Sequence, residues 1–547
     1  MDINLIDVTS WRKDDEHGIF PRGARDKKML WSPNDAPEGI KPEWPYLFKL
    51  SRDAYPDQYW METVAYIVGD VMGVPVPKAL PARRMMENGE YEYGALLEWF
   101  YDQSSQLFVH ASDFFHVLIS DFDDSSGRHH DLVDLRLICR AFSIRGLISP
   151  DWIQWLYDML LFDALIGNSD RHQENWGFVF VPESAPGITP PKVKGYLAPY
   201  FDNGTSLGHE RYVERIRGWN HQNVDEYIQR GCHHLRKNRA DTHERLGHIS
   251  SIQDLALDEQ SKAYLARRLE FDFQELVDKI DSLCEISSDV PFTRERADWT
   301  IRLLRRRYLR LSLILNMRTI NRIMEPTRLL LTWQPPTGGT RYVVGQIDRQ
   351  QGDNYVFTYH FQSEDYAKAQ EKGFAGHPAF SLKSEEHTNN VLDPFVRRLP
   401  PRKRKDFAEY LAQHLLPHPF EGSDFALLGY TGAKSPGDGF CLVPDPEILN
   451  SEGELLFEVA GTRYQEGLDL SKVMVGDLVK LVPEEDNPVD PHAIAVVHES
   501  GKLGYINKVL CKKLKQKIAK HKISAFVAKK NGTPERPLVY LLVECRS

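Results

Sequence analysis

The sequence predicts an α+β protein of several domains: a large mixed core, a small α+β subdomain and a final all-β domain. At 547 residues the chain is too long for one hydrophobic core. The residue pattern changes near Glu325-Pro326, and short strands separated by turns follow in the C-terminal part. We expect four regions: a core over 1–320 with lobes of about 1–105 and 106–320, a subdomain over 325–447 and a final domain over 453–547.

The composition is typical of a globular protein of the cytoplasm. Hydrophobic residues make up 41% of the chain and charged residues 27%. No apolar run approaches the roughly 18 residues of a membrane span, and the N-terminal residues lack a signal-peptide pattern. Six cysteines without a CxxC pair indicate neither a disulfide framework nor a zinc site, so we expect a reducing cytoplasm.

A net charge of −10 argues against a protein that coats nucleic acid uniformly. The charge is uneven, because the segment from Lys508 to Lys530 contains nine lysines and no acidic residue. Such a run predicts a face that attracts phosphates. The alternative is a solvated face of a lysine-rich helix.

In the first lobe, a lysine inside an apolar strand and a glutamate on the next helix form a candidate pair. Residues 46–50 read as a buried strand that contains Lys49, whose ammonium is costly to bury without a partner. Residues 58–72 have helical apolar spacing, with Glu62 near their start. A strand lysine held by a helix glutamate is the arrangement that positions nucleotide phosphates in kinases. The alternatives are a snorkelling lysine and a surface glutamate.

Two further segments of the first lobe are candidates for nucleotide contacts. Gly23 lies just before a strand together with Arg25 and Lys27, where backbone amides and cations can cradle phosphates. The predicted strand 94–100, which includes Glu98, is a candidate hinge beside a nucleotide base and would contribute backbone groups.

The strongest functional pattern lies in the second lobe. Asp170 and Asn175 are five residues apart in a polar loop that follows an apolar helix predicted over 152–166. Two β-rich stretches, 176–181 and 193–201, then lead to Asp202. In phosphoryl transfer an aspartate orients the attacking hydroxyl and accepts its proton, while an asparagine and a second aspartate hold Mg²⁺. Each residue alone is also a common turn residue.

This segment resembles the catalytic loop of the HipA-like serine/threonine kinases, in which Asp-Arg-His, a later Asn and a metal-binding Asp form the active site. Those positions fall on Asp170, Arg171, His172, Asn175 and Asp202. The resemblance covers residues 1–320 and is strongest from 162 to 208. It implies a bilobal protein-kinase-like core that uses ATP and Mg²⁺ to phosphorylate a serine or threonine of a protein.

The resemblance also implies that Lys49 binds the α- and β-phosphates and that Glu62 holds it. It further implies a role in toxin–antitoxin, growth-arrest or defence systems, with a DNA-binding antitoxin as partner. The family's glycine loop often carries a regulatory serine, but no serine or threonine lies between Trp11 and Trp31, so we do not expect that regulation. The alternative function is a non-catalytic, nucleic-acid-binding scaffold with a degraded kinase fold.

Beyond the catalytic segment, residues 209–317 have Leu, Arg and Glu at helical spacing and predict a helical lobe that ends with an amphipathic helix over 299–316. Residues 325–447 then combine strands and helices. Strands are expected at 328–333, 341–346 and 355–361, and helices at 405–416 and 424–428. This region is similar to the small N-terminal subdomain of the HipA-like kinases, although here it follows the core. The alternative is an unrelated α+β interaction domain.

The final segment predicts strands at 457–464, 476–482, 486–497 and 502–506. It resembles a HIRAN domain, a small OB-like β-barrel that recognises free 3′ ends of single-stranded DNA. The resemblance implies three DNA contacts: Arg463 to phosphate, Tyr464 stacked on a base and Asp490 at the terminal hydroxyl. Val489 stands where the end-binding members carry an aromatic residue. Barrel packing and a surface cation are the alternative roles for Tyr464 and Arg463.

Overall fold

A computed structural model of the chain describes residues 3–15, 25–119, 122, 129–183, 193–240, 244–352, 354–435, 437–445, 447–448, 452–487, 490–520, 523–533 and 535–545. The chain divides into two compact units. The first contains Met1–Trp219 and Asn223–Asn316, and the second contains Asn220–Gln222 and Met317–Ser547.

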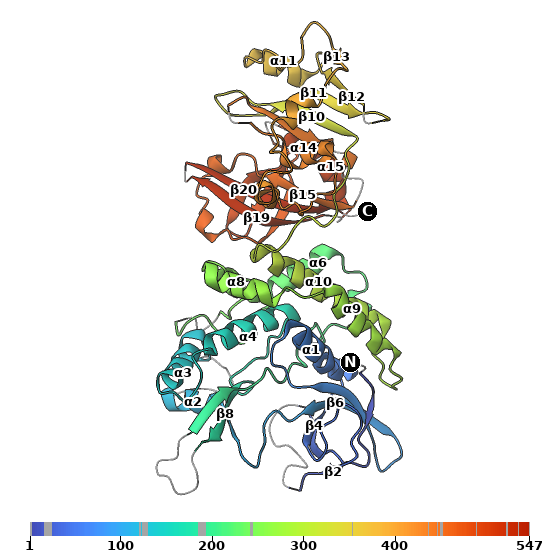
Figure 1. Ribbon diagram of the computed structural model, residues 1–547, viewed down its shortest axis with the longest axis vertical. Coiled ribbons are helices and arrows are strands. Elements are labelled where there is room, and N and C mark those ends of the chain that lie inside the picture. The colour runs from blue at the N-terminus through green and yellow to red at the C-terminus, as the bar shows by residue number, and fades with distance from the viewer. Residues whose placement is uncertain are drawn as a thin grey trace. The chain divides into compact units, whose positions relative to one another are not determined.

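The first unit begins with a six-stranded sheet (Figure 1). Its strands lie in the order β1 (Ile6–Asp7), β5 (Ala79–Met85), β6 (Tyr91–Glu98), β4 (Pro45–Leu50), β3 (Lys27–Trp31) and β2 (Arg12–Lys13). β1 pairs with β5 in parallel, and the other neighbours are antiparallel. A cluster that includes Trp11, Tyr46 and Phe48 fills one face of this sheet. The short 3-10 helix η1 (Pro56–Gln58) and helix α1 (Tyr59–Met72) follow β4 and contribute Glu62.

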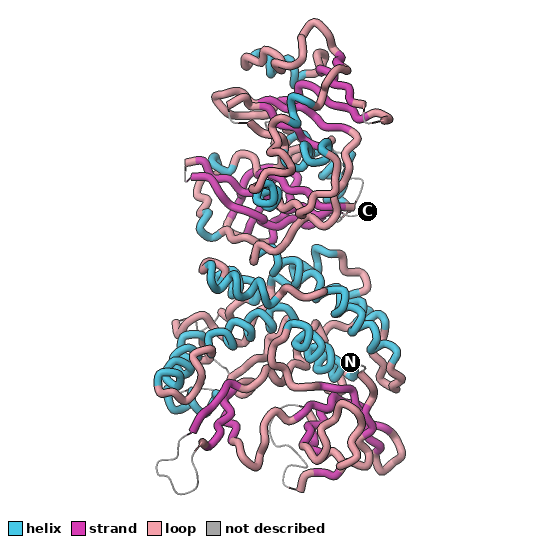
Figure 2. Tube along the Cα trace, viewed as in Figure 1, coloured by secondary structure: helices cyan, strands magenta, loops and turns pink. Residues whose placement is uncertain are grey.

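The rest of the first unit is a small sheet and a set of helices. The sheet has the order β7 (Leu107–His110), β8 (Gly177–Pro182), β9 (Val193–Leu197). The helices are α2 (Ala111–Leu118), α3 (Leu132–Ile144), α4 (Trp152–Ile166), α5 (Val213–Ile216), α6 (His221–Gln229), α7 (His248–Leu255), α8 (Glu259–Arg268), α9 (Phe273–Ser282) and α10 (Arg294–Ile314), with the 3-10 turn η2 (Leu283–Glu285) after α9. In Figure 2 the strands of this unit lie on one side and most helices on the other.

Helix α4 has the bounds that its apolar run predicts. It is buried over most of its length, and it ends at Gly167, which has a left-handed φ of 70°. A Cβ at Gly167 would lie 2.6 Å from Nη2 of Arg307 in α10. Glycine is therefore needed here both for the backbone conformation and for the close guanidinium, and the turn delivers the chain directly into the Asp170 loop.

The second unit contains two sheets. The first has the order β13 (Glu386–His387), β12 (Tyr355–Tyr359), β11 (Tyr342–Arg349), β10 (Arg328–Trp333), β14 (Phe440–Pro444). It is accompanied by the helices α11 (Glu364–Glu371), α12 (Asp393–Val396), α13 (Phe407–Gln413) and α14 (Asp424–Thr431). Its core is rich in aromatic residues, such as Phe357, Tyr359 and Phe380. The strands and helices predicted for this region are present with small shifts of their ends.

The other sheet of this unit has six antiparallel strands in the order β15 (Gly453–Glu458), β20 (Arg536–Cys545), β19 (Ile523–Thr533), β16 (Leu478–Pro483), β17 (Ile494–His498), β18 (Gly501–Tyr505). A single antiparallel bridge also joins Ala460, just after β15, to Tyr505 in β18. The expected mixture of α and β domains is thus confirmed, whereas the closed OB-like barrel stays a prediction.

One local prediction for the C-terminal segment was wrong. Thr462–Tyr464 was expected in a strand but forms the 3-10 turn η4, because Gly461 before it adopts a left-handed φ of 77°. A second 3-10 turn, η5, covers Leu470–Lys472. The lysine run is divided between helix α15 (Lys508–Ala519) and strand β19, so its charges do not share one face of one helix.

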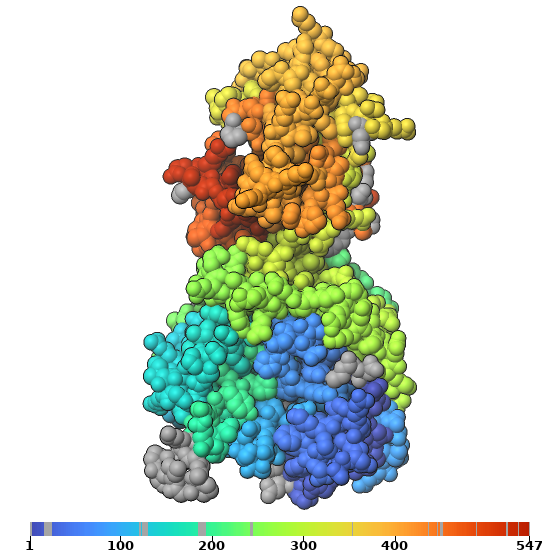
Figure 3. Space-filling model, viewed as in Figure 1, coloured from blue at the N-terminus to red at the C-terminus, as the bar shows by residue number. Residues whose placement is uncertain are grey.

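Figure 3 shows, in the first unit, N-terminal residues in blue next to the green residues of the helical part.

In the described part of the chain, we find no helix whose length and apolar character would let it cross a membrane.

Candidate active site

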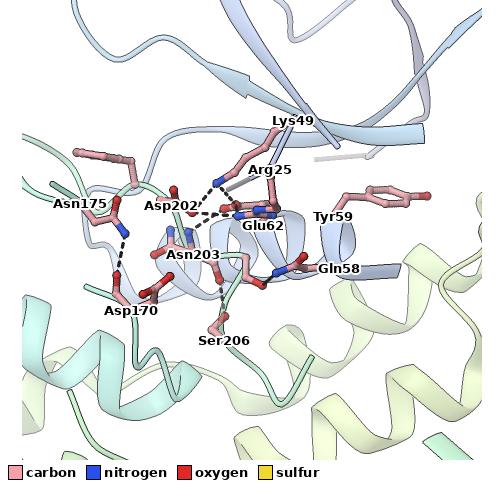
Figure 4. Close-up of polar contacts among 12 residues, drawn as sticks. Arg25, Lys49, Gln58, Tyr59, Glu62, Asp170, Asn175, Asp202, Asn203 and Ser206 are labelled. Carbon is pink, nitrogen blue, oxygen red and sulfur yellow. Dashed lines mark hydrogen bonds and ion pairs between the residues drawn. The ribbon is translucent and has the colours of Figure 1, made fainter. Parts of the chain in front are cut away.

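Four charged side chains from four separate segments of the chain meet in the first unit (Figure 4). Lys49 Nζ in β4 lies 3.0 Å from Glu62 Oε1 in α1 and forms a second ion pair with Asp202 Oδ1. Arg25 Nη2 contacts the same two oxygens, at 2.8 Å from Glu62 and 3.0 Å from Asp202. The predicted Lys49–Glu62 pair is therefore present, and Asp202 and Arg25 complete a cluster in which the charges cancel.

Because the cluster is largely buried, each of its charged groups depends on the oppositely charged groups beside it. The side chains of Lys49, Glu62 and Arg25 are 4%, 1% and 6% exposed, whereas Asp202 is 27% exposed and forms its open side. Burial by itself would raise the pKa of Asp202 and Glu62, but the charges of Lys49 and Arg25 outweigh it and hold both pKa values below the usual range. Both carboxylates are accordingly ionised at neutral pH, as a cation or metal partner requires.

Asp202 has an unusual backbone conformation. Its φ is 58°, in the left-handed region that residues other than glycine rarely adopt. The next residue, Asn203, fixes the turn, because its N–H donates to Glu62 Oε2 at 2.8 Å and its Nδ2 donates to Tyr200 O at 2.7 Å. The helix glutamate thus holds both Lys49 and the loop that carries Asp202.

Arg171 connects this turn to the catalytic-loop segment. Its guanidinium is 1% exposed and binds Asp163 in α4 through Nε at 3.2 Å and through Nη2 at 2.8 Å. The same guanidinium donates to Asn203 Oδ1 at 2.7 Å and to Phe201 O. One buried arginine therefore fixes the residues on both sides of Asp202 against α4.

Asp170 lies at the start of a tight loop beyond α4. Its N–H donates to Asn168 Oδ1 at 3.0 Å, and its carbonyl accepts from Asn175 Nδ2 at 2.7 Å. Asp170 and His172 are partly exposed, whereas Asn175 is 5% exposed. Because the Asn175 nitrogen is directed to the loop backbone, the amide oxygen is the atom that could bind a cation (Figure 4).

Gly204 closes the cluster from the other side. A Cβ at this position would lie 2.5 Å from Arg25 Nη1 and 2.8 Å from Glu62 Oε1. Gln58, just before α1, donates from Nε2 to Gly204 O at 3.1 Å. Arg25 Nη1 itself is buried without a hydrogen-bond partner. The site therefore contains one cationic donor in excess of the acceptors that the described residues provide.

The other predicted nucleotide contacts differ in position. Lys27 is the register partner of Lys49 across β3 and β4, and burial together with the positive charge of Lys49 lowers its pKa. Glu98 lies away from the cluster: its carboxylate pairs with Lys41, and its N–H donates to Lys78 O at 2.8 Å. Gly23 lies outside the described residues, so its predicted role stays a prediction.

The donor atoms suit Mg²⁺. Asp202 offers a carboxylate and Asn175 an amide oxygen, and Mg²⁺ is typically held by one or two such protein oxygens, with phosphates and water as its other ligands. Within the described ranges, no group of three or more His, Cys, Asp or Glu residues is arranged to hold a metal alone.

A second candidate site lies in the second unit, around Tyr505 of β18. Asn487 Nδ2 lies 3.3 Å from Tyr505 Oη, and Asn487 Oδ1 accepts from Asp490 N at 3.2 Å. Ala460, just before the η4 turn, exchanges both backbone hydrogen bonds with Tyr505, at 2.7 and 2.8 Å. Tyr505 therefore joins the segment that leads to Tyr464 to the segment that carries Asp490.

Tyr464 is 64% exposed, which is unusual for a large aromatic side chain. The guanidinium of Arg463 lies 4.6 Å above this ring. The exposure of Tyr464 does not fit the alternative in which it packs inside a barrel.

Many lysines of the run have acidic or carbonyl partners within the second unit. Lys508 binds Asp365 at 3.1 Å, Lys513 binds Glu447 at 3.2 Å and Lys515 binds Glu485 at 3.0 Å. Lys530 donates to Leu470 O at 2.9 Å. The prediction of one continuous phosphate-attracting face is therefore weakened.

Sequence reasoning missed three parts of the first site. Asn203 and Gly204 read as a turn signal only, and Asp163 read as one polar position in an apolar helix. The signal for Asp163 was available, because a carboxylate in a buried helix requires a cation, and the Arg171 of the loop is the nearest candidate in sequence.

Two family models match the chain. The model of the HipA N-terminal domain matches residues 340–438, and the model of the HIRAN domain matches residues 452–542. The chain carries a HipA N-terminal domain and a HIRAN domain. The resemblance that the sequence suggested, a HipA-like chain with a C-terminal HIRAN domain, is thereby confirmed.

No curated protein matches the chain in sequence. Among solved structures, the crystal structure of the Helicobacter pylori proinflammatory kinase CtkA is similar at 19% identity and a TM-score of 0.42, over 55% of this chain and 94% of that chain. A likeness of this level does not establish a shared activity, so the function of this chain is argued from its own site.

Proposed function

We propose that the first unit is an ATP- and Mg²⁺-dependent protein kinase of the HipA-like class, which transfers the γ-phosphoryl group to a serine or threonine of a protein. The observation that carries the proposal is the buried cluster of Lys49, Glu62 and Asp202. Phosphoryl transfer in kinases uses a lysine held by a glutamate and a carboxylate for the metal, and here Lys49 contacts both carboxylates.

Each residue has a chemical task in this proposal. Lys49 binds phosphate oxygens of the nucleotide, and Glu62 keeps its ammonium in place. Asp202 and Asn175 would hold Mg²⁺, whose charge would offset the negative charge that develops on the phosphates. Asp170 orients the acceptor hydroxyl and takes its proton as the new O–P bond forms and the bond to the leaving ADP breaks.

Arg25, which belongs to this cluster, and the neighbouring Lys27 add positive charge to the site. In the cluster Arg25 Nη2 shares Asp202 Oδ1 with Lys49. An incoming triphosphate would give the buried Arg25 Nη1 an acceptor. We propose that Arg25 moves from Asp202 to a phosphate when the nucleotide and its metal bind.

The proposal is tested with purified full-length protein. Mg·ATP is expected to raise the thermal unfolding midpoint, and labelled phosphate is expected to reach protein in a lysate. Asp170→Asn should abolish transfer but keep the thermal shift, because it removes the base and not a phosphate contact. Asp113→Asn, the same chemical change at an exposed position of α2, is the matched control. Absence of both the thermal shift and transfer in the unsubstituted protein would leave the scaffold as the better explanation.

For the HIRAN domain we propose recognition of single-stranded DNA with a free 3′ end. Tyr464 supplies a stacking face, Arg463 pairs with a phosphate and Asp490 accepts from the terminal hydroxyl. Strands with free and 3′-phosphorylated ends, titrated at two salt concentrations, separate end recognition from charge attraction. Asp490→Asn should reduce the preference for the free end, and equal affinity for both ends in the unsubstituted protein would refute the proposal.

We also propose a toxin–antitoxin or defence role with a DNA-binding antitoxin as partner, which rests on the HipA relationship alone. Co-purification of the chain with a DNA-binding protein from its own cells would test it.

A further inference from the structure

Helix α7, which lies outside the predicted catalytic segment, contacts the Asp170 loop through one buried side chain. His248 is the first residue of α7, and its side chain is 0% exposed. Its Nε2 donates to the carbonyl of Asn168 at 2.9 Å. Asn168 is two residues before Asp170 and accepts the Asp170 N–H on its side-chain oxygen at 3.0 Å.

Asn168 is the centre of this arrangement. Besides the bonds to His248 and Asp170, its Nδ2 donates to Asp163 Oδ1 at 3.2 Å, and its N–H donates to Asp163 O at 2.9 Å. Both side-chain groups and both backbone groups of Asn168 are thus engaged. The loss of any one of these hydrogen bonds is expected to shift the backbone of Asp170.

Arg307 of α10 fixes the tautomer of His248. Its Nη1 donates to Ala164 O, at the end of α4, at 2.8 Å and lies 3.4 Å from His248 Nδ1. A guanidinium only donates, so Nδ1 of His248 is the acceptor and the proton of the neutral ring is on Nε2. That is the tautomer that can donate to Asn168 O.

The environment keeps this histidine neutral. Burial lowers the pKa of His248 well below its usual value, and the neighbouring His233 and Arg307 lower it further, against the bond to Asn168. The His233 ring lies edge-on at 4.5 Å, and burial lowers its pKa to about 3, so it is also uncharged. The groups that face His248 therefore include one fixed positive charge, on Arg307.

The two glycines beside this pair show how closely it is packed. A Cβ at Gly231 would lie 2.8 Å from His248 Nδ1, and a Cβ at Gly167 would lie 2.6 Å from Arg307 Nη2. Backbone thus encloses both side chains, which restricts their movement and makes them suited to hold a loop.

We propose that His248 is a positioning residue for the proposed phosphoryl transfer: with Arg307 it holds Asn168, and through Asn168 it sets the position of Asp170. This inference rests on the proposed kinase function. It also adds a structural claim that can be measured without activity, namely that α7 and α10 restrain the Asp170 loop.

The test compares three variants of the full-length chain. His248→Leu removes the donor to Asn168 and the acceptor for Arg307. His248→Gln keeps a donor of similar reach, because the glutamine amide nitrogen lies near the place of Nε2. Ile252→Val removes a buried methylene from the same helix without removing a hydrogen bond to the loop, and is the matched control for a general loss of stability.

The first readout is amide hydrogen exchange of peptides that cover residues 168–176. The N–H groups of Asp170, His172 and Asn175 are hydrogen-bonded within this loop, so their exchange reports its order. We expect at least about fivefold faster exchange in His248→Leu, partial recovery in His248→Gln and no change in Ile252→Val. Unchanged exchange in His248→Leu would overturn the inference.

The second readout is kinetic. We expect kcat to fall about tenfold in His248→Leu with the KM for ATP unchanged, and His248→Gln to restore part of it, because a single positioning hydrogen bond is lost. An equal loss in Ile252→Val would show a general effect of stability and overturn the positioning role. If the unsubstituted protein binds no Mg·ATP and transfers no phosphate, the kinase proposal fails, and the exchange experiment still decides whether His248 restrains the loop.

Discussion

Replacing Glu62 by glutamine tests the charge cluster directly. Glu62 is 1% exposed and accepts from Lys49 Nζ at 3.0 Å, Arg25 Nη2 at 2.8 Å and Asn203 N–H at 2.8 Å. Glutamine keeps the shape and one acceptor, but it removes the charge and turns a donor either toward the two cations or toward the Asn203 N–H. Removing one partner of a buried ion pair costs about 3–5 kcal/mol. At about 2 °C per kcal/mol for a unit of this size, the unfolding midpoint should fall by about 6–10 °C.

The assay is urea and thermal unfolding of the full chain, followed by tryptophan fluorescence. Glu275→Gln is the control, because Glu275 is 56% exposed and its i,i+4 pair with Lys279 is worth about 0–1 kcal/mol. A double-mutant cycle with Lys49→Gln should give a coupling energy of about 1–3 kcal/mol, since the double variant restores neutrality. A loss for Glu62→Gln no larger than for Glu275→Gln, or a coupling energy near zero, would refute the reasoning.

Three further predictions follow from the same structure. The lowered pKa values of Glu62 and Asp202 mean that the unfolded chain binds more protons near pH 4, so the stabilisation by these carboxylates is present above about pH 4 and is lost as the pH falls. The urea midpoint should therefore fall more steeply from about pH 6 to pH 3 for the unsubstituted protein than for Glu62→Gln. Parallel curves of the urea midpoint against pH would contradict this prediction. Tyr464→Ala should weaken the binding of single-stranded DNA by about 5- to 150-fold through lost stacking, whereas Arg463→Ala should lower the salt dependence of the DNA affinity by about one phosphate contact. Fluorescence anisotropy at several salt concentrations measures both effects. An unchanged affinity for Tyr464→Ala would exclude stacking. Arg318→Met should destabilise the second unit by about 3–5 kcal/mol, because Arg318 is 3% exposed and its loss leaves the carboxylates of Glu454 and Glu544 facing each other. Limited proteolysis of the full chain, followed at sites within residues 317–547, measures the change. Unchanged resistance to proteolysis would show that the carboxylates find other partners.

Local structure was largely predictable from the sequence. Helix α4 begins and ends where its apolar run does, because Gly167 ends it in a left-handed conformation that glycine adopts readily. Strand β4 and helix α1 were expected within one residue of their observed bounds, because alternating and helical apolar spacing act over a few residues. The η4 turn was not, because Gly461 reversed a pattern that reads as a strand.

The sequence by itself named the residues to which we assign the proposed chemistry: Lys49, Glu62, Asp170, Asn175 and Asp202 were each predicted from residue type and spacing. Only the tertiary structure decided how they are held. Lys49 and Asp202 are 153 positions apart, and Arg25 and Asp202 are 177 positions apart. The contacts of His248 and Arg307 with the Asp170 loop likewise join distant segments. Such contacts depend on how sheets and helices pack, which no local pattern encodes, whereas the energetic need of a buried charge for a partner is already present in the sequence.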